Sequence, residues 1–164
     1  MRVKQLFMIG VVLFCALLLA GCQTTTGHYL GAKAEHSTVL QLQDALRAEQ
    51  HWQDLYVSVD YRVQQQGNQL VTQGVFTFAD YPQLNQARVY DFKLKLFLLN
   101  KEQLVVDYFD LYRTLGQSLR EQMVFKKTVQ ISSEVTALSF GYEGAFLDET
   151  GARDSVWKLP KRNF

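Results

Sequence analysis

The sequence predicts an all-β fold, an antiparallel β-sandwich of about seven or eight strands. Three observations carry this prediction. Beyond residue 54, apolar and polar side chains alternate with the period of two that a half-buried strand requires. Short polar turns separate the alternating segments. No long stretch between them has the 3.6-residue period of a helix that would connect parallel strands.

The clearest strand is expected at residues 90–99, YDFKLKLFLL. Its even-numbered residues are all apolar, whereas Asp91, Lys93 and Lys95 occupy odd positions. Because successive side chains of a strand point to opposite faces, we expect the even face to lie in the core and the odd face to meet solvent. On this prediction Leu96→Asp is severely destabilising, while Lys95→Asp is tolerated.

A β-hairpin is expected over residues 55–78, with its turn at Gly67-Asn68. The apolar face of its first half holds Leu55, Val57, Val59, Tyr61 and Val63. A loop is expected around Pro82, and Pro160 stops the last strand. The further strands are expected at 104–112, 123–131, 135–146 and 155–159.

Residues 39–50 fit two patterns. Leu40 and Leu42 alternate with glutamines as in a strand, whereas Val39, Leu42 and Leu46 fit one face of a helix. We expect a short strand followed by a helical or loose turn.

The start of the chain has the composition of an export signal. Arg2 and Lys4 precede an uncharged run of 15 residues from Leu6 to Ala20. A stop-transfer helix is the competing interpretation, but such a helix needs about 20 apolar residues to cross the hydrocarbon of a bilayer. Export is therefore favoured.

The run ends in LAGC at residues 19–22, which resembles the lipobox of bacterial lipoproteins. The resemblance implies a diacylglycerol on the Cys22 thiol, removal of residues 1–21, and usually a third acyl chain on the new amino terminus. Several acyl chains hold a protein to a membrane durably, whereas one holds it only marginally. Gln23 follows the cysteine, which in proteobacterial lipoproteins points to the outer membrane. A coincidental cysteine at the end of an ordinary signal peptide is the alternative.

We therefore divide the chain into a lipoprotein signal peptide at 1–21, a polar and aperiodic tether at 22–37, and a single β-sandwich domain at 38–164. The signal holds two of the 17 basic residues and none of the 16 acidic ones, so 15 basic residues face 16 acidic ones in the remainder. This near neutrality argues against nucleic-acid binding. Cys15 would leave with the signal and Cys22 would carry lipid, so we expect neither a disulfide nor a cysteine metal site.

The stretch from Gly74 to Gly144 also resembles the FxLYD type of immunoglobulin-like domain of bacterial lipoproteins. The similar parts are GVFTF at 74–78, KLKLFLLNKEQLVV at 93–106 and a glycine turn at Gly116. The aspartate-glycine usual at the central turn of that family is replaced by NKEQ. The resemblance implies that the sandwich is immunoglobulin-like.

No catalytic, metal-binding or cofactor-binding residue is expected. His28 and His36 lie in the tether, and we interpret His51 beside Trp52 as a structural pair at the edge of the domain. The acidic turn at 147–154 offers oxygen atoms that calcium prefers, but its spacing does not match an EF-hand loop. We interpret its Asp148, Glu149 and Asp154 as turn residues.

We expect a lipid-anchored cell-envelope lipoprotein, on the outer membrane and facing the periplasm, that acts as a non-catalytic protein-interaction or structural module. Its expected partners are the membrane, through Cys22, and an envelope protein. The alternative is a lipoprotein that binds a small molecule or glycan through exposed aromatic rings near Trp52, near Trp157 or on a sheet face. Tyr56, Phe97 and Phe109 occupy strand positions that point away from the predicted core, so they are further candidates for exposed rings.

Overall fold

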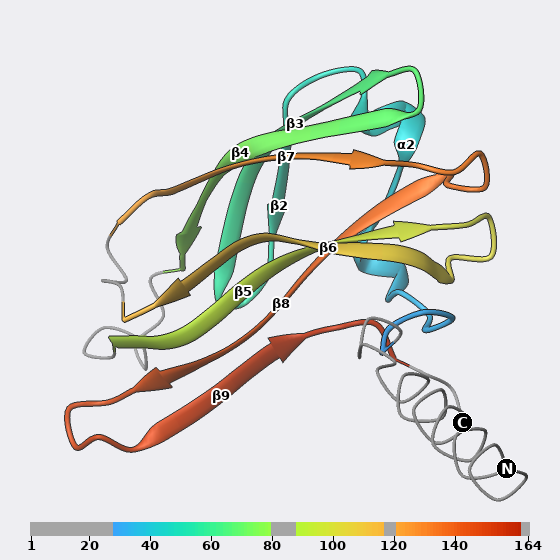
Figure 1. The fold of residues 1–164 in the computed structure, drawn as a ribbon. Coiled ribbons are helices and arrows are strands. Elements are labelled where there is room, and N and C mark those ends of the chain that lie inside the picture. Colours follow the sequence, from blue (N-terminus) through green and yellow to red (C-terminus); the bar gives the residue numbers. More distant parts are fainter. Residues whose placement is uncertain (1–27, 80–87, 117–120, 162–164) are drawn as a thin grey trace, which may run out of the picture.

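The computed structural model describes residues 28–79, 88–116 and 121–161. They form two antiparallel sheets packed face to face, which confirms the predicted β-sandwich (Figure 1). The described residues contain nine strands, where the sequence predicted seven or eight. The expected signal peptide and Cys22 lie outside the described residues. Within the part that the structure describes, no helix is long and apolar enough to cross a membrane.

One sheet has the strand order β2-β3-β4-β7. Its strands are β2 (Gln50–Gln53), β3 (Val57–Gln66), β4 (Gln69–Phe78) and β7 (Met123–Gln130). The predicted hairpin is β3–β4, and Gly67 in its turn has a φ of 62°, which glycine adopts without steric cost. The sequence does not predict β2, because Trp52 is the only apolar residue in this strand.

The other sheet has the order β1-β8-β5-β6, and β9 also pairs with β8. Its strands are β1 (Val39–Gln41), β5 (Arg88–Leu99), β6 (Val105–Leu115), β8 (Ala137–Leu147) and β9 (Arg153–Lys158). Along one edge, the first residues of β8 thus pair with β1 and its later residues pair with β9. The strands β3-β4-β7 face β9-β8-β5-β6, which is an immunoglobulin-like order.

The main core lies between the sheets and is rich in aromatic rings. Phe92 of β5 stacks on Phe76 of β4 and on Tyr142 of β8, with ring centroids 5.6 and 5.8 Å apart. All three side chains are fully buried. The Tyr142 hydroxyl donates a hydrogen bond to Asp54 at 2.7 Å, so its polar end is satisfied. Burial of each such side chain stabilises the fold by roughly 1.5–3 kcal/mol.

Residues 39–50 adopt the predicted strand and helical turn. A 3₁₀ turn, η2 (His36–Thr38), precedes β1, which pairs with β8. The short helix α2 (Leu42–Ala45) follows at once and buries two side chains, those of Leu42 and Ala45. The chain then enters β2.

The second half of the expected tether packs against the domain. Ala32 and Ala34 are buried. Between them, Lys33 exchanges two backbone hydrogen bonds with Lys161, of 2.9 and 3.0 Å. Packing onto the domain thus includes residues 29–34, which lie before its expected start at residue 38. We call residues 29–34 the docked segment.

The docked segment overturns one prediction about β5. The even face of β5 is buried from Phe92 onward, as predicted, but the odd face is covered as well. Phe97 and Leu99 are fully buried there, in a second cluster that includes both alanines of the docked segment. Lys95, which the sequence places in solvent, is only 5 % exposed. The prediction of a solvated Lys95 is wrong because a distant part of the chain covers it.

Two apolar residues expected on the core face lie outside the core. Tyr90 is 49 % exposed, because the pairing with β8 shifts register between Val89 and Asp91 and turns this side chain away. Leu55 is 51 % exposed, since β3 begins only at Val57. The predicted alternation thus fails where a strand bulges or has not yet begun.

Candidate functional site

The outer face of the five-stranded sheet carries opposite charges from three strands. In register, Lys93 of β5 lies beside Glu143 of β8 on one side and Arg113 of β6 on the other. Asp91 lies two residues along β5, on the same face, as the period of two requires. Strand pairing thus gathers charges that are far apart in the sequence.

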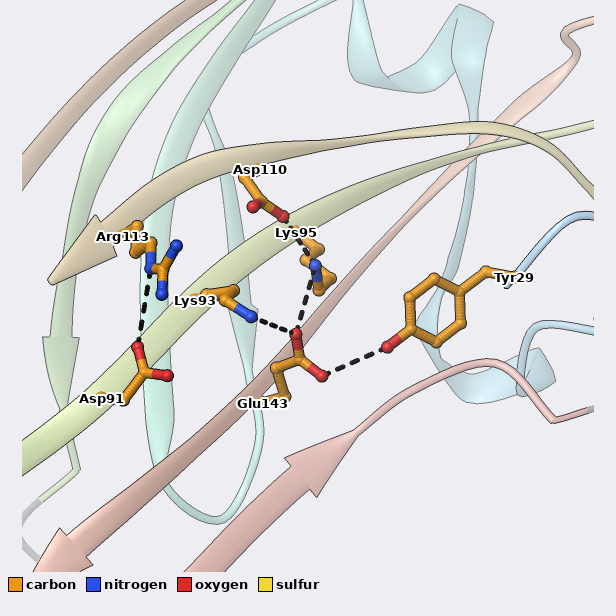
Figure 2. Close-up of polar contacts among 7 residues, drawn as sticks. All are labelled: Tyr29, Asp91, Lys93, Lys95, Asp110, Arg113 and Glu143. Carbon is orange, nitrogen blue, oxygen red and sulfur yellow. Dashed lines mark hydrogen bonds and ion pairs between the residues drawn. The ribbon is translucent and has the colours of Figure 1, made fainter. Parts of the chain in front are cut away.

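Glu143 and Lys95 are the centre of a polar network (Figure 2). Nζ of Lys95 lies 2.6 Å from Oδ1 of Asp110 and 3.4 Å from Oε1 of Glu143. Lys93 donates a hydrogen bond to the same Oε1 at 3.0 Å, and the Tyr29 hydroxyl donates one to Oε2 at 3.2 Å. We call these five residues the clamp network.

Tyr29 joins the clamp network to the docked segment. Its ring packs edge-on against Phe97 and Tyr108, with centroids 5.4 and 5.0 Å away. Nζ of Lys95 lies 5.7 Å from the ring centroid, within the range of a cation–π interaction. Burial, together with the charge of Glu143, raises the pKa of Tyr29 to about 12, so its hydroxyl stays protonated as a donor.

Glu143 is held in its ionised form. Burial alone would raise its pKa, but the hydrogen bond from Lys93 and the charge of Lys95 outweigh burial and hold the pKa below its usual range. Lys95 needs these partners, because a buried ammonium group without a counter-charge is costly. The network is therefore a set of mutually satisfied ion pairs.

Asp91 and Arg113 form a looser pair next to the clamp network (Figure 2). Oδ1 of Asp91 lies 3.7 Å from Nε of Arg113, longer than a hydrogen bond. This buried oxygen has no hydrogen-bond partner within the described residues. The side chain as a whole is 31 % exposed, so the fold leaves part of the hydrogen-bonding capacity of this carboxylate unfilled.

A hollow of about 370 Å³ opens beside these pairs, between β5, β8 and β9. Its polar and aromatic lining consists of Asp91, Lys93, Glu143, Arg153, Ser155 and Trp157, and Gly144 and Ala145 add only small groups. Trp157 is 66 % exposed. The guanidinium of Arg153 lies 5.0 Å from the Tyr90 ring centroid, and among the described residues no carboxylate pairs with it. We call this region the Trp157 hollow.

A second hollow, of about 700 Å³, lies on the outer face of the other sheet. Two exposed ion pairs line it. Arg62 bonds Glu49 at 2.8 Å, and Nδ1 of His51 bonds Asp60 at 2.7 Å. The hydrogen bond with Asp60 raises the pKa of His51. Exposed pairs of this kind contribute little to stability.

The two tryptophans, both candidates for a binding platform, differ in exposure. Trp52 stacks on Phe140 with centroids 5.7 Å apart and packs against the main core. Trp157 is the exposed one. Of the aromatic residues on outward registers, Phe97 is fully buried, while Tyr56 and Phe109 are partly buried against the core.

The acidic turn is held by its own hydrogen bonds. Asp148 accepts three of them, from the amide and hydroxyl of Thr150 and from the amide of Ala152, and the Thr150 hydroxyl in particular lowers the pKa of Asp148. Asp154 lies in β9, beyond the turn. In the part of the chain that the structure describes, no three His, Cys, Asp or Glu side chains gather as a metal site would require.

Comparisons of the chain with protein-family models, curated proteins and solved structures found no match. The resemblances to bacterial lipoproteins and to the FxLYD type of domain therefore rest on the residues quoted above.

Sequence reasoning missed the clamp network. Tyr29 lies in the expected tether, and Glu143 interrupts a strand whose other residues are mostly buried. The spacing of Lys93 and Lys95 on one face of β5 was a usable signal, since two lysines on a covered face need a carboxylate opposite.

Proposed function

We propose that the chain is a lipid-anchored lipoprotein of the cell envelope, whose sandwich domain is a non-catalytic module that docks another envelope component. Cys22 is its lipid attachment site, and the periplasmic face of the outer membrane is its location. The observation that carries the proposal is the clamp network, which fixes the chain shortly after the lipobox to the domain.

The clamp network limits the distance between lipid and domain. Tyr29 follows Cys22 by seven residues. An extended chain advances at most about 3.6 Å per residue, so Tyr29 lies no more than about 25 Å from the acylated cysteine. A domain held this close to the bilayer has a restricted orientation, which suits a module that presents one face to a fixed partner.

The charges of the clamp network support docking rather than catalysis. General acid–base catalysis needs a group whose pKa lies near the working pH. Lys93 and Lys95 instead hold the pKa of Glu143 below its usual range, and Asp110 is bonded to Lys95. Aromatic and arginine side chains, which are enriched in interfaces, lie on the same sheet face.

Metabolic labelling with a palmitate analogue tests the anchor in bacteria that express the full chain. Wild-type protein should carry label and fractionate with membranes. Cys22→Ala should lose the label and leave an unprocessed or soluble form, whereas Cys15→Ala, a matched change within the apolar run, should behave as wild type. Labelled, membrane-bound Cys22→Ala protein would overturn the proposal.

Crosslinking in intact envelopes tests the docking role. The lipidated chain should be recovered joined to the same envelope component in repeated experiments. Repeated recovery of the chain alone would count against a docking module.

A further inference from the structure

The Trp157 hollow combines an exposed aromatic ring with a polar lining that includes Arg153, which has no carboxylate partner among the described residues. We propose that it binds an acidic disaccharide unit of an envelope glycan, with one sugar ring stacked on Trp157 and the ligand carboxylate paired with Arg153. The inference deepens the proposed function by naming the docked component, and it rests on that function only for the choice of an envelope glycan.

Trp157 supplies the stacking surface. Its side chain is 66 % exposed. On β9, Trp157 lies directly opposite the half-buried Glu143 of β8. The flat, apolar C–H face of a pyranose ring fits an exposed indole. The partly buried Trp52, by contrast, already has the Phe140 ring stacked on it.

Arg153 supplies the charge that selects an acidic ligand. Three other cations of this face have carboxylate partners, since Lys93 and Lys95 bond Glu143 and Arg113 lies beside Asp91. Arg153 has none among the described residues, and its guanidinium lies 5.0 Å from the Tyr90 ring centroid, a contact that uses no N–H donor. A planar guanidinium binds a carboxylate with two parallel hydrogen bonds.

The separation of these two groups sets the size of the ligand. Arg153 and Trp157 are four residues apart on one face of β9, with Ser155 between them. A strand rises about 3.4 Å per residue, so the two Cα atoms are about 14 Å apart. Two linked sugar rings match this spacing better than a single ring does.

The lining also matches the hydroxyl groups of a sugar. The carboxylates of Asp91 and Glu143 and the hydroxyl of Ser155 accept hydrogen bonds, and Lys93 donates them. The small residues Gly144 and Ala145 leave room for the rings between these groups. The volume of about 370 Å³ is within the range of small-molecule sites.

Calorimetric titration of the purified full chain, in a detergent without a sugar headgroup, tests the inference. The two probes are N-acetylglucosaminyl-N-acetylmuramic acid and N,N′-diacetylchitobiose, which lacks the lactyl carboxylate. The acidic disaccharide should bind at least about tenfold more tightly, because a charge-assisted hydrogen bond changes the affinity by more than a factor of about ten. No binding of the acidic probe at millimolar concentration would overturn the inference.

Variants separate the two contacts. Trp157→Ala should weaken both disaccharides, while Arg153→Gln should weaken the acidic one about tenfold and leave the neutral one unchanged. Val124→Ala, an exposed change on the opposite sheet, is the control and should alter neither. Equal affinity for the two probes, or unchanged binding by Trp157→Ala, would overturn the inference. Lipid labelling at Cys22 does not depend on this site, so the two proposals fail separately.

Discussion

Nζ of Lys95 lies 2.6 Å from Oδ1 of Asp110, although the Lys95 side chain is only 6 % exposed. The rings of Tyr29 and Tyr108 lie 5.7 and 5.9 Å from the same nitrogen. One buried cation therefore ties together β5, β6 and the docked segment. This arrangement reverses the behaviour that the sequence alone predicts for position 95.

We expect Lys95→Asp to be severely destabilising. The change removes the counter-charge of Asp110 and Glu143 and adds a third carboxylate among them, at a cost of about 3 kcal/mol or more in the free energy of unfolding. Lys126→Asp, a matched change at an exposed position of β7, should cost about 0.5 kcal/mol or less. Urea denaturation of the full chain measures both. Equally small effects would mean that the clamp network does not form.

The clamp network should make stability depend on acid pH. A carboxylate whose pKa is lowered in the folded state stabilises the fold above its unfolded pKa, which for Glu143 is about 4.5. This stabilisation is lost as the pH falls through the folded pKa. Urea midpoints of wild type and Glu143→Gln should therefore differ at pH 6 and converge as the pH falls below 4.5 and through the lowered pKa. A constant difference over this range would contradict the ionic role of Glu143.

Tyr29 should control the docking of residues 29–34. Tyr29→Ala removes the ring contacts with Phe97 and Tyr108, whereas Tyr29→Phe removes only the hydrogen bond to the Glu143 carboxylate, which is worth about 1.5 kcal/mol. Hydrogen exchange of the Gly31 amide, which donates to the carbonyl of Val105, should accelerate strongly in Tyr29→Ala and slightly in Tyr29→Phe.

The β3–β4 hairpin provides the internal control for this experiment, because its amides lie in the other sheet and should exchange as in wild type. Unchanged exchange at Gly31 in Tyr29→Ala would show that the clamp does not hold the segment.

The pair of His51 and Asp60 should titrate above the usual range of histidine. An NMR titration should give His51 a pKa above 6.5, and Asp60→Asn should lower it, because the hydrogen bond to the carboxylate is the largest cause of the shift. With a raised folded pKa, the stabilisation is complete below pH 6.5 and is lost as the pH rises through that pKa. An unchanged His51 pKa in Asp60→Asn would contradict this pairing.

Local alternation predicted the sandwich, the β3–β4 hairpin and the even face of β5 from Phe92 onward. It failed for Lys95, Phe97 and Leu99, because their cover comes from residues 29–34, which are some 60 positions away in the sequence. Periodicity shows which face of a strand is apolar, but it does not show which distant segment packs on the other face. The apolar side chains at both odd and even positions of 96–99 were the local sign of a strand buried on both faces.

The candidate site was harder to predict than the fold. Trp157 was singled out from the sequence, but its exposure follows from its place on β9 opposite Glu143. The sequence predicts no binding role for Arg153. Its proximity to Tyr90 depends on the register shift in β5, which no local pattern reveals.

Intact-mass spectrometry of the full chain, purified from the membranes of an expressing bacterium, tests the central claim most directly. The account predicts a protein that begins at Cys22, lacks residues 1–21 and carries the added mass of two or three acyl chains. The acyl mass should map to the peptide that contains Cys22. A protein that retains residues 1–21, begins at another residue or carries no acyl mass would contradict the account.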